Sequence, residues 1–279
     1  MLVVRRWDID RTLLEYPAES LAGAPLAREV LLYADLRGAD LRGADLTAAD
    51  LCQADLRDAR LAGATLIGAD ITLADLEGAD LSGSSLGDAR LQAINRRRPG
   101  PMRTRFVGAD LTRATLKNSN LSGSRFDDAV LRRADLTRCD LTGAVLTGAD
   151  LTGATLDFAI LAGADLRHAT LVGATLTGAN LEGADLRGAD LSLASLNGVR
   201  LAEANLADSL WSNTALARSA DLARARGLDQ LRLGEPSGAD LASLRESLHL
   251  FADDLLAHFG VERREAAALR GLSSRPKDP

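Results

Sequence analysis

The chain has 279 residues, a formal net charge of −6, 46% hydrophobic residues and only 3% aromatic residues. So few aromatic residues exclude an ordinary globular core, and together with the negative charge they argue against direct nucleic-acid binding. The first residues lack a signal-peptide core, and no stretch is long and apolar enough to span a membrane. We therefore expect a cytoplasmic location without membrane contact.

Residues 1–33 are predicted to form an N-terminal cap. "VVRRWDI" and "TLLEYPA", on either side of "DR", predict a short hairpin, and "ESLAGAPLAREVLLY" predicts a helix that leads into the repeat described next. Three leucines in this helix keep the spacing of that repeat. However, Glu19 and Glu29 occupy positions where the repeat needs a small residue, so we assign the segment to the cap.

From residue 34 onwards an apolar residue recurs every five residues. Between Leu36 and Leu206, 33 of 35 such positions hold Leu, Ile or Phe, and 27 of the residues two before them are Ala. A period of five would place successive leucines about 140° apart on a helix and on alternate faces of a strand. They can share one interior only if the chain turns a corner between them. Four corners make a twenty-residue coil, so the pattern predicts an all-β solenoid of about nine coils.

Pentads of the form A-(D/N)-L-x-x, such as "ADLRG", "ANLEG" and "ADLTG", resemble those of pentapeptide repeat proteins. The resemblance covers residues 34 to about 216 and implies a right-handed quadrilateral β-helix, which we assign to residues 34–217. It also implies a non-enzymatic, protein-binding role. Some members of this family protect DNA gyrase and topoisomerase IV from antibiotic poisons by presenting a DNA-like acidic surface, so these enzymes are candidate partners.

The segment "QAINRRRPGPMRTR", residues 92–105, breaks the pattern. Arg96 and Pro101 stand at inward positions, and an arginine cannot be buried there without a partner. We therefore expect a projecting loop on a rigid scaffold, which is where binding residues often lie. The alternative is an insertion without function. The arginines that the loop would present are Arg96, Arg97, Arg98, Arg103 and Arg105.

Charge varies along the repeat. The net charge is −6 over residues 34–91, +7 over residues 92–138 and −6 over residues 139–216, so the rod does not imitate DNA uniformly. Two functions stay open: a topoisomerase-binding partial DNA mimic, and an interaction scaffold that docks an acidic partner through residues 92–138. For the first, spacing in multiples of twenty predicts one acidic edge, interrupted by Arg90 and Val130 and formed by Asp50, Asp70, Asp110, Asp150 and Asp190.

Residues 218–279 are predicted to form a helical capping or dimerisation segment with a disordered tail. Apolar residues spaced three or four apart would form one stripe on a helix. This stripe could cover the last coil or pair with a second copy, and the family resemblance favours a homodimer. Its residues are Leu241, Leu244, Leu248, Phe251, Leu255 and Phe259.

The sequence contains no constellation that indicates catalysis, a cofactor or a metal. Of the three histidines, His249 and His258 are nine residues apart and would lie on opposite sides of a helix. The Asp and Gly residues do not follow the nine-residue period of calcium-binding β-rolls, and no phosphate-binding glycine loop occurs. We expect the many aspartates to accept hydrogen bonds from nearby backbone N–H groups at the corners.

Overall fold

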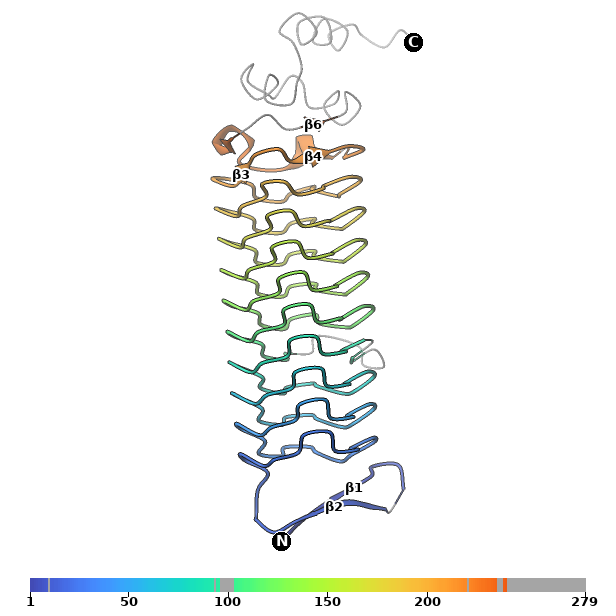
Figure 1. Ribbon diagram of the computed structural model, residues 1–279. Helices are drawn as coiled ribbons and strands as arrows, with labels where there is room; N and C mark the ends of the chain where they lie inside the picture. Colours follow the sequence, from blue (N-terminus) through green and yellow to red (C-terminus); the bar gives the residue numbers. More distant parts are fainter. Residues whose placement is uncertain (10, 93, 96–102, 220, 235–237, 240–279) are drawn as a thin grey trace, which may run out of the picture.

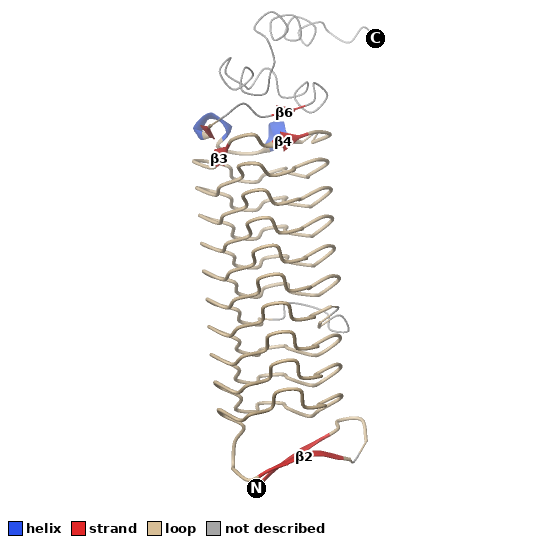
Figure 2. Ribbon diagram, in the orientation of Figure 1, coloured by secondary structure: helices blue, strands red, loops and turns tan. Residues whose placement is uncertain are grey.

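The computed structural model describes residues 1–9, 11–92, 94–95, 103–219, 221–234 and 238–239. Figure 1 shows a rod of stacked coils with a hairpin at its N-terminal end. Figure 2 shows that the coils contain few regular strands, because each side of a coil is only a few residues long. The rod is the all-β solenoid that the five-residue period predicts.

Each coil pairs in parallel with the next one, at single residues on its four sides. Asp45 pairs with Thr65, for example, and Asp50 with Asp70. Next to each bridge, the N–H of the inward leucine donates to a carbonyl of the following coil, as Leu61 does to Asp80 at 2.7 Å. The chain turns each corner through a residue with positive φ two positions after the leucine. Glycine is frequent there because it adopts this conformation without strain.

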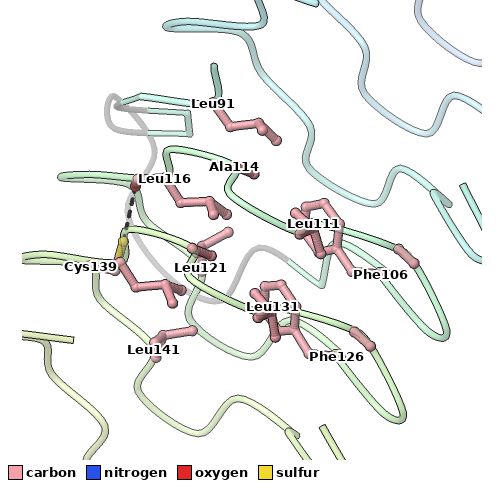
Figure 3. Close-up of a cluster of buried hydrophobic side chains, with 14 of the residues drawn as sticks. Leu91, Phe106, Leu111, Ala114, Leu116, Leu121, Phe126, Leu131, Cys139 and Leu141 are labelled. Carbon is pink, nitrogen blue, oxygen red and sulfur yellow. Dashed lines mark hydrogen bonds between the residues drawn. The ribbon is translucent and has the colours of Figure 1, made fainter. Parts of the chain in front are cut away.

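The interior consists of the inward leucines and the small residues beside them. Leu46 and Ala44 are fully buried, as are their equivalents along the rod. Two leucine positions hold Phe106 and Phe126 instead, whose rings stack at a centroid distance of 4.7 Å and an interplanar angle of 8° (Figure 3). The inward phase read from the sequence is therefore confirmed.

The N-terminal hairpin is also present. Strand β1 (Leu2–Arg5) pairs antiparallel with β2 (Thr12–Tyr16). The hairpin is joined to the first coil by a hydrogen bond from the N–H of Asp35 to the carbonyl of Arg5, 2.7 Å long. Trp7 adds a bond from its Nε1 to the carbonyl of Gln53, 2.8 Å long, one coil further along.

The helix predicted between the hairpin and residue 34 is wrong, because the coils begin at Leu21. Leu21 is 1% exposed, and Leu26 N–H already donates to the carbonyl of Asp45 in the next coil. Glu29 fits at a small position because the first coil has no coil beneath it, and its side chain is exposed. Pro25 stands at a pairing position of the same end and offers no N–H there, which discourages association through the open edge.

At the other end the stack continues past residue 217. Strands β3 (Leu210–Trp211) and β4 (Ala215–Leu216) pair in parallel with β5 (Arg232–Leu233) and β6 (Gly238–Ala239). Between them lie two 3₁₀ turns, η1 (Leu222–Arg224) and η2 (Leu228–Gln230). Residues 241–259, where the apolar helix is predicted, lie outside the described residues, so the homodimer stays a prediction.

Candidate protein-binding site at an interrupted coil

The predicted loop coincides with a shift in the pairing register. Before and after it, each residue pairs with the residue twenty positions ahead, but Asp80 pairs with Arg105 and Arg90 with Thr115, twenty-five positions ahead. Five extra residues are therefore inserted into one coil. Residues 21–205 include these five extra residues. The other 180 residues of this range make nine coils of twenty residues each. A further coil begins at Leu206, whose N–H donates to the carbonyl of Arg226.

Asn95 joins the coils on either side of the insertion. In an uninterrupted coil the leucine N–H donates to a backbone carbonyl, whereas the N–H of Leu76 donates to the side-chain Oδ1 of Asn95 at 2.7 Å. The Nδ2 of Asn95 donates to the carbonyl of Asn120 in the coil above, at 3.2 Å. Asn95 is 2% exposed and has a φ of 56°, a conformation that asparagine tolerates better than most residues. Its amide replaces backbone hydrogen bonds that the insertion interrupts.

Two buried hydroxyl groups complete this connection. Thr104 Oγ1 donates to the carbonyl of Leu76 at 2.9 Å, and Ser119 Oγ donates to the carbonyl of Leu91 at 2.8 Å. Ser119 Oγ also accepts a hydrogen bond from the N–H of Ile94, at 3.2 Å. The roles of Asn95 and Thr104 are not among the predictions made from the sequence. Thr104 carries a signal, because it replaces the alanine usual two positions before an inward residue, whereas Asn95 occupies a pairing position at which the repeat usually has a polar residue.

Of the five predicted loop arginines, the structure describes two. Arg105 lies 3.8 Å from Asp80, measured from Nε to Oδ1, and is half exposed. Arg103 is exposed and lines an open cavity of about 290 Å³ together with Arg37, Arg57 and Glu77. Arg96, Arg97 and Arg98 lie outside the described residues. The base of the predicted loop is therefore basic. Arg105 pairs with Asp80, whereas Arg103 lines the cavity.

The basic segment that follows is largely paired with nearby acids. The pairs are Arg113 with Asp88 at 3.0 Å, Lys117 with Asp135 at 2.8 Å, Arg125 with Asp127 at 3.0 Å, and Arg132 with Asp150 at 2.5 Å. Among the described residues, Arg133 and Arg138 form no such ion pair. The guanidinium of Arg138 instead lies 5.9 Å from the ring centroid of Phe158. Together with the exposed Arg103, which also has no ion pair among the described residues, these two cations are the ones most available to an acidic partner.

The prediction of one acidic edge is wrong. Asp50 stacks on Asp70 and then on Arg90, and this column continues to Thr115 and Asp135. Because the five extra residues advance the chain by one side of the square, Asp110 stacks on Ser85 instead. The five aspartates therefore lie on two neighbouring faces. The second face holds three of them on alternate coils, in the column Ser85, Asp110, Val130, Asp150, Thr170, Asp190.

The aspartates before the inward leucines accept hydrogen bonds at the corners, as expected. Asp110 Oδ1 accepts from the N–H of Thr112 at 2.9 Å, and Asp190 Oδ1 from that of Ser192 at 2.9 Å. Others also bind an arginine two residues ahead. Two hydrogen bonds from the guanidinium of Arg42, each 2.8 Å long, lower the pKa of Asp40 to about 2. Much of the acidic surface is thus partly neutralised.

Within the described part of the chain, no group of three or more His, Cys, Asp or Glu side chains could hold a metal ion. In that same part, no helix is both long enough and apolar enough to cross a membrane. Cys139 is buried one coil beyond Ser119, and its Sγ donates to the carbonyl of Leu116 at 3.0 Å (Figure 3). Burial raises the pKa of this thiol to about 12, so Cys139 is an interior packing residue.

Comparison with known proteins agrees with this geometry. The sequence profile described as pentapeptide repeats matches residues 34–72, 59–95, 104–143, 129–171 and 159–198. The chain belongs to the pentapeptide repeat family. Proteins of this family fold as right-handed β-helices. The matches stop at 95 and resume at 104, so the interruption described above separates two pentapeptide repeat segments.

Several solved pentapeptide repeat structures are similar to this chain. HetL of the cyanobacterium Nostoc sp. strain PCC 7120, which is involved in heterocyst differentiation regulation, is 27% identical over 75% of this chain and 87% of its own, with a TM-score of 0.39. Full-length QnrB1, a plasmid-mediated fluoroquinolone resistance protein, is 17% identical over 80% and 98%, with a TM-score of 0.34. Both TM-scores lie below 0.5, so the roles of HetL and QnrB1 are not assigned to this chain. No functionally curated protein matches the chain in sequence.

Proposed function

We propose that this pentapeptide repeat protein is a cytoplasmic, non-enzymatic, protein-binding rod whose binding determinant is the interrupted coil. The observation that carries the proposal is the buried side-chain connection made by Asn95 and Thr104. It maintains hydrogen bonding between the coils below and above the insertion, so the scaffold around the extra residues stays rigid. A rigid scaffold lowers the ordering cost of binding a partner.

The partner that we propose is DNA gyrase or topoisomerase IV, which the rod would bind and protect from antibiotic poisons as a partial DNA mimic. Support comes from the column that carries Asp110, Asp150 and Asp190 on alternate coils of one face. Coils stack about 4.8 Å apart, so these carboxylates recur every ~10 Å. They lie on the same rod as the interrupted coil, and one protein can contact both.

The test compares the intact rod with a shortened rod in which residues 96–102 are replaced by Leu-Thr. This change removes five residues, restores the twenty-residue period and places a leucine at the inward position. Affinity for purified gyrase and topoisomerase IV is measured at several salt concentrations. We expect the intact rod to bind and the shortened rod to bind at least about tenfold more weakly, since one binding side chain contributes about 1.4 kcal/mol or more at a hot spot.

Arg187→Ser is the matched control, because Arg187 pairs with Asp185 at a corner far from the insertion. This variant should bind like the intact rod. Absence of binding by the intact rod at micromolar concentration, or equal binding by the shortened rod, contradicts the proposal in this form.

A second candidate is a scaffold that docks an acidic protein. The observation that favours it is that Arg133 and Arg138 carry no ion pair among the described residues, although their basic neighbours do. A polyglutamate peptide is a suitable probe. We expect Arg133→Ser combined with Arg138→Ser to weaken its binding more than Arg37→Ser combined with Arg187→Ser, because Arg37 and Arg187 are held by Asp35 and Asp185. Equal weakening contradicts this candidate.

A further inference from the structure

One face of the C-terminal half of the rod is almost free of charge. We call it the neutral face; it consists of residues 153–158, 173–178 and 193–198, which lie on three successive coils. Thr155 pairs with Thr175, and Thr175 with Ser195, along its centre. Asp157 is the one charged residue among its eighteen, whereas 26% of the whole chain is charged. A face of this composition stands out on a rod whose other columns carry charge at most coils.

Two large apolar side chains are exposed at opposite corners of the neutral face. Phe158 is 55% exposed, and Leu193, two coils further along, is 61% exposed. Phe158 leans towards the next coil, because a Cβ added to Gly178 would meet its Cε1 at 2.7 Å. The other corner positions of the face are glycines. Phe158 covers Gly178, and a Cβ added at Gly153 would make an ordinary contact with Arg133 Cγ at 3.5 Å. A Cβ added at Gly198 would meet only backbone atoms of Gly178, at 3.9 Å, and one at Gly173 would meet nothing within 4 Å.

We propose that the neutral face binds the same face of a second, antiparallel copy of this chain. The two-fold axis lies in the plane of the interface, passes through Thr175 and is perpendicular to the long axis of the rod. It brings the coil of Thr155 in one copy opposite the coil of Ser195 in the other. It places Phe158 of one copy opposite Gly198 of the other, and Leu193 opposite Gly153. Each exposed apolar side chain then meets a position that lacks a side chain. This is the self-complementarity that an isologous interface requires.

The polar residues of the face match under the same axis. Asp157 comes to lie opposite Asn197, whose amide donates to a carboxylate, and Thr155 lies opposite Ser195. No like charges face one another within the three coils. Arg133, Asp135 and Arg138 lie in the preceding coil and Arg218 in the following one. The axis places Arg138 opposite Arg218, and this like-charge pair limits the face to a length of about 14 Å at the ~4.8 Å coil spacing. An interface of this length is smaller than that of a stable dimer, so the association is weak and reversible.

Site-specific cross-linking tests this arrangement in the full chain. The background is Cys52→Ser, since Cys139 is buried and its raised pKa keeps it unreactive. Thr177→Cys places a thiol beside the axis and opposite itself in the second copy. Thr147→Cys is the matched control: it replaces an equally half-buried threonine at the diagonally opposite corner of the rod. A short bismaleimide should cross-link Thr177→Cys with a yield that rises with protein concentration, and should cross-link Thr147→Cys at least about tenfold less.

Charge placed on the face provides the second arm. Phe158→Glu or Leu193→Glu, added to Thr177→Cys, should reduce cross-linking about tenfold without changing thermal melting, because both side chains are exposed. Ile160→Glu is the control, since Ile160 is 43% exposed and lies just around the corner on the next face. A dimer formed through residues 240–279 would respond to none of these changes. Equal cross-linking at residues 177 and 147, or persistence of cross-linking in both Phe158→Glu and Leu193→Glu, overturns the proposal.

Discussion

Asn95 does with one side chain what backbone groups do elsewhere in the rod. Its carbonyl oxygen accepts a hydrogen bond from the coil below and its amide nitrogen donates one to the coil above. An aspartate would lack the donor, and an alanine would lack both groups. Because the surroundings are buried, a missing partner leaves a desolvated backbone group without a hydrogen bond, which costs about 1–3 kcal/mol for each group.

We therefore expect Asn95→Ala to lower the free energy of unfolding by about 2–4 kcal/mol, since it orphans Leu76 N–H and removes the bond to Asn120. Urea unfolding followed by circular dichroism measures the change. Asn197→Ala is the control. Asn197 makes a hydrogen bond to Ser195 in a half-exposed position, and its loss should cost less than about 1 kcal/mol. Equal effects of the two substitutions would show that Asn95 does not hold the coils together.

The corner aspartates make stability depend on acid pH. Hydrogen bonds from arginines two residues ahead lower the pKa values of Asp35, Asp40 and Asp165, that of Asp40 to about 2. In the unfolded chain an aspartate has a pKa of about 3.9. A pKa lowered by folding adds stability that is present above the unfolded value and is lost as the pH falls through the folded value.

The melting temperature should therefore be nearly constant from pH 7 to about pH 5 and should fall between about pH 4 and pH 2. Thermal melting across this range measures it, and an NMR titration of the Asp40 carboxyl gives its folded pKa directly. A melting temperature that is unchanged at pH 2, or an Asp40 pKa near 4, would contradict this assignment.

At the scale of elements, the hairpin covers one side of the N-terminal end of the stack, beside Ala34 and Asp35. Trp7 donates to the carbonyl of Gln53, and its ring packs on that of Tyr33 at a centroid distance of 5.8 Å. The guanidinium carbon of Arg6 lies 4.5 Å from the centre of the Tyr33 ring. In a solenoid each coil contacts only its neighbours, so a defect at one end affects that end first. The hairpin thus protects the first coils and does little for distant ones.

Trp7→Ala should accelerate amide hydrogen exchange in the first two coils, residues 21–60, by about tenfold, because it removes a hydrogen bond and an aromatic contact worth about 1–2 kcal/mol together. Exchange in residues 141–180 should stay the same. Hydrogen exchange with mass spectrometry resolves the two regions. Equal acceleration in both would show that the rod unfolds as one unit and that the hairpin is not a local cap.

The five-residue period predicts most of the coil geometry from sequence, because only one interior is compatible with it. The period does not identify the first coil, since Glu29 is acceptable only where no coil lies beneath, and a pentad by itself does not show that it is the first. The prediction of one acidic edge is wrong for a related reason. An insertion of five residues preserves the inward phase but moves every later residue to the neighbouring face, so Asp110 leaves the column of Asp70.

At the scale of the whole molecule, the insertion divides the rod into two stacks whose twenty-residue registers differ by one face, although the pairing columns continue from one stack into the other. Asp50 and Asp70 lie on one face of the first stack, and Asp110, Asp150 and Asp190 lie on the next face of the second stack. The interrupted coil lies between them, with Arg103 exposed at its base. The faces of Asp70 and Asp110 share one corner of the rod, whereas the five extra residues fall between Asn95 and Arg105, at the diagonally opposite corner.

The most direct test of this account is DNA supercoiling by purified gyrase in the presence of a gyrase poison, with the intact rod or the rod shortened at residues 96–102. Thermal melting of the shortened rod establishes beforehand that it is folded. We expect the intact rod to restore supercoiling at micromolar concentration and the shortened rod not to restore it. Restoration by both rods would contradict the role of the interrupted coil, and restoration by neither would contradict protection of gyrase.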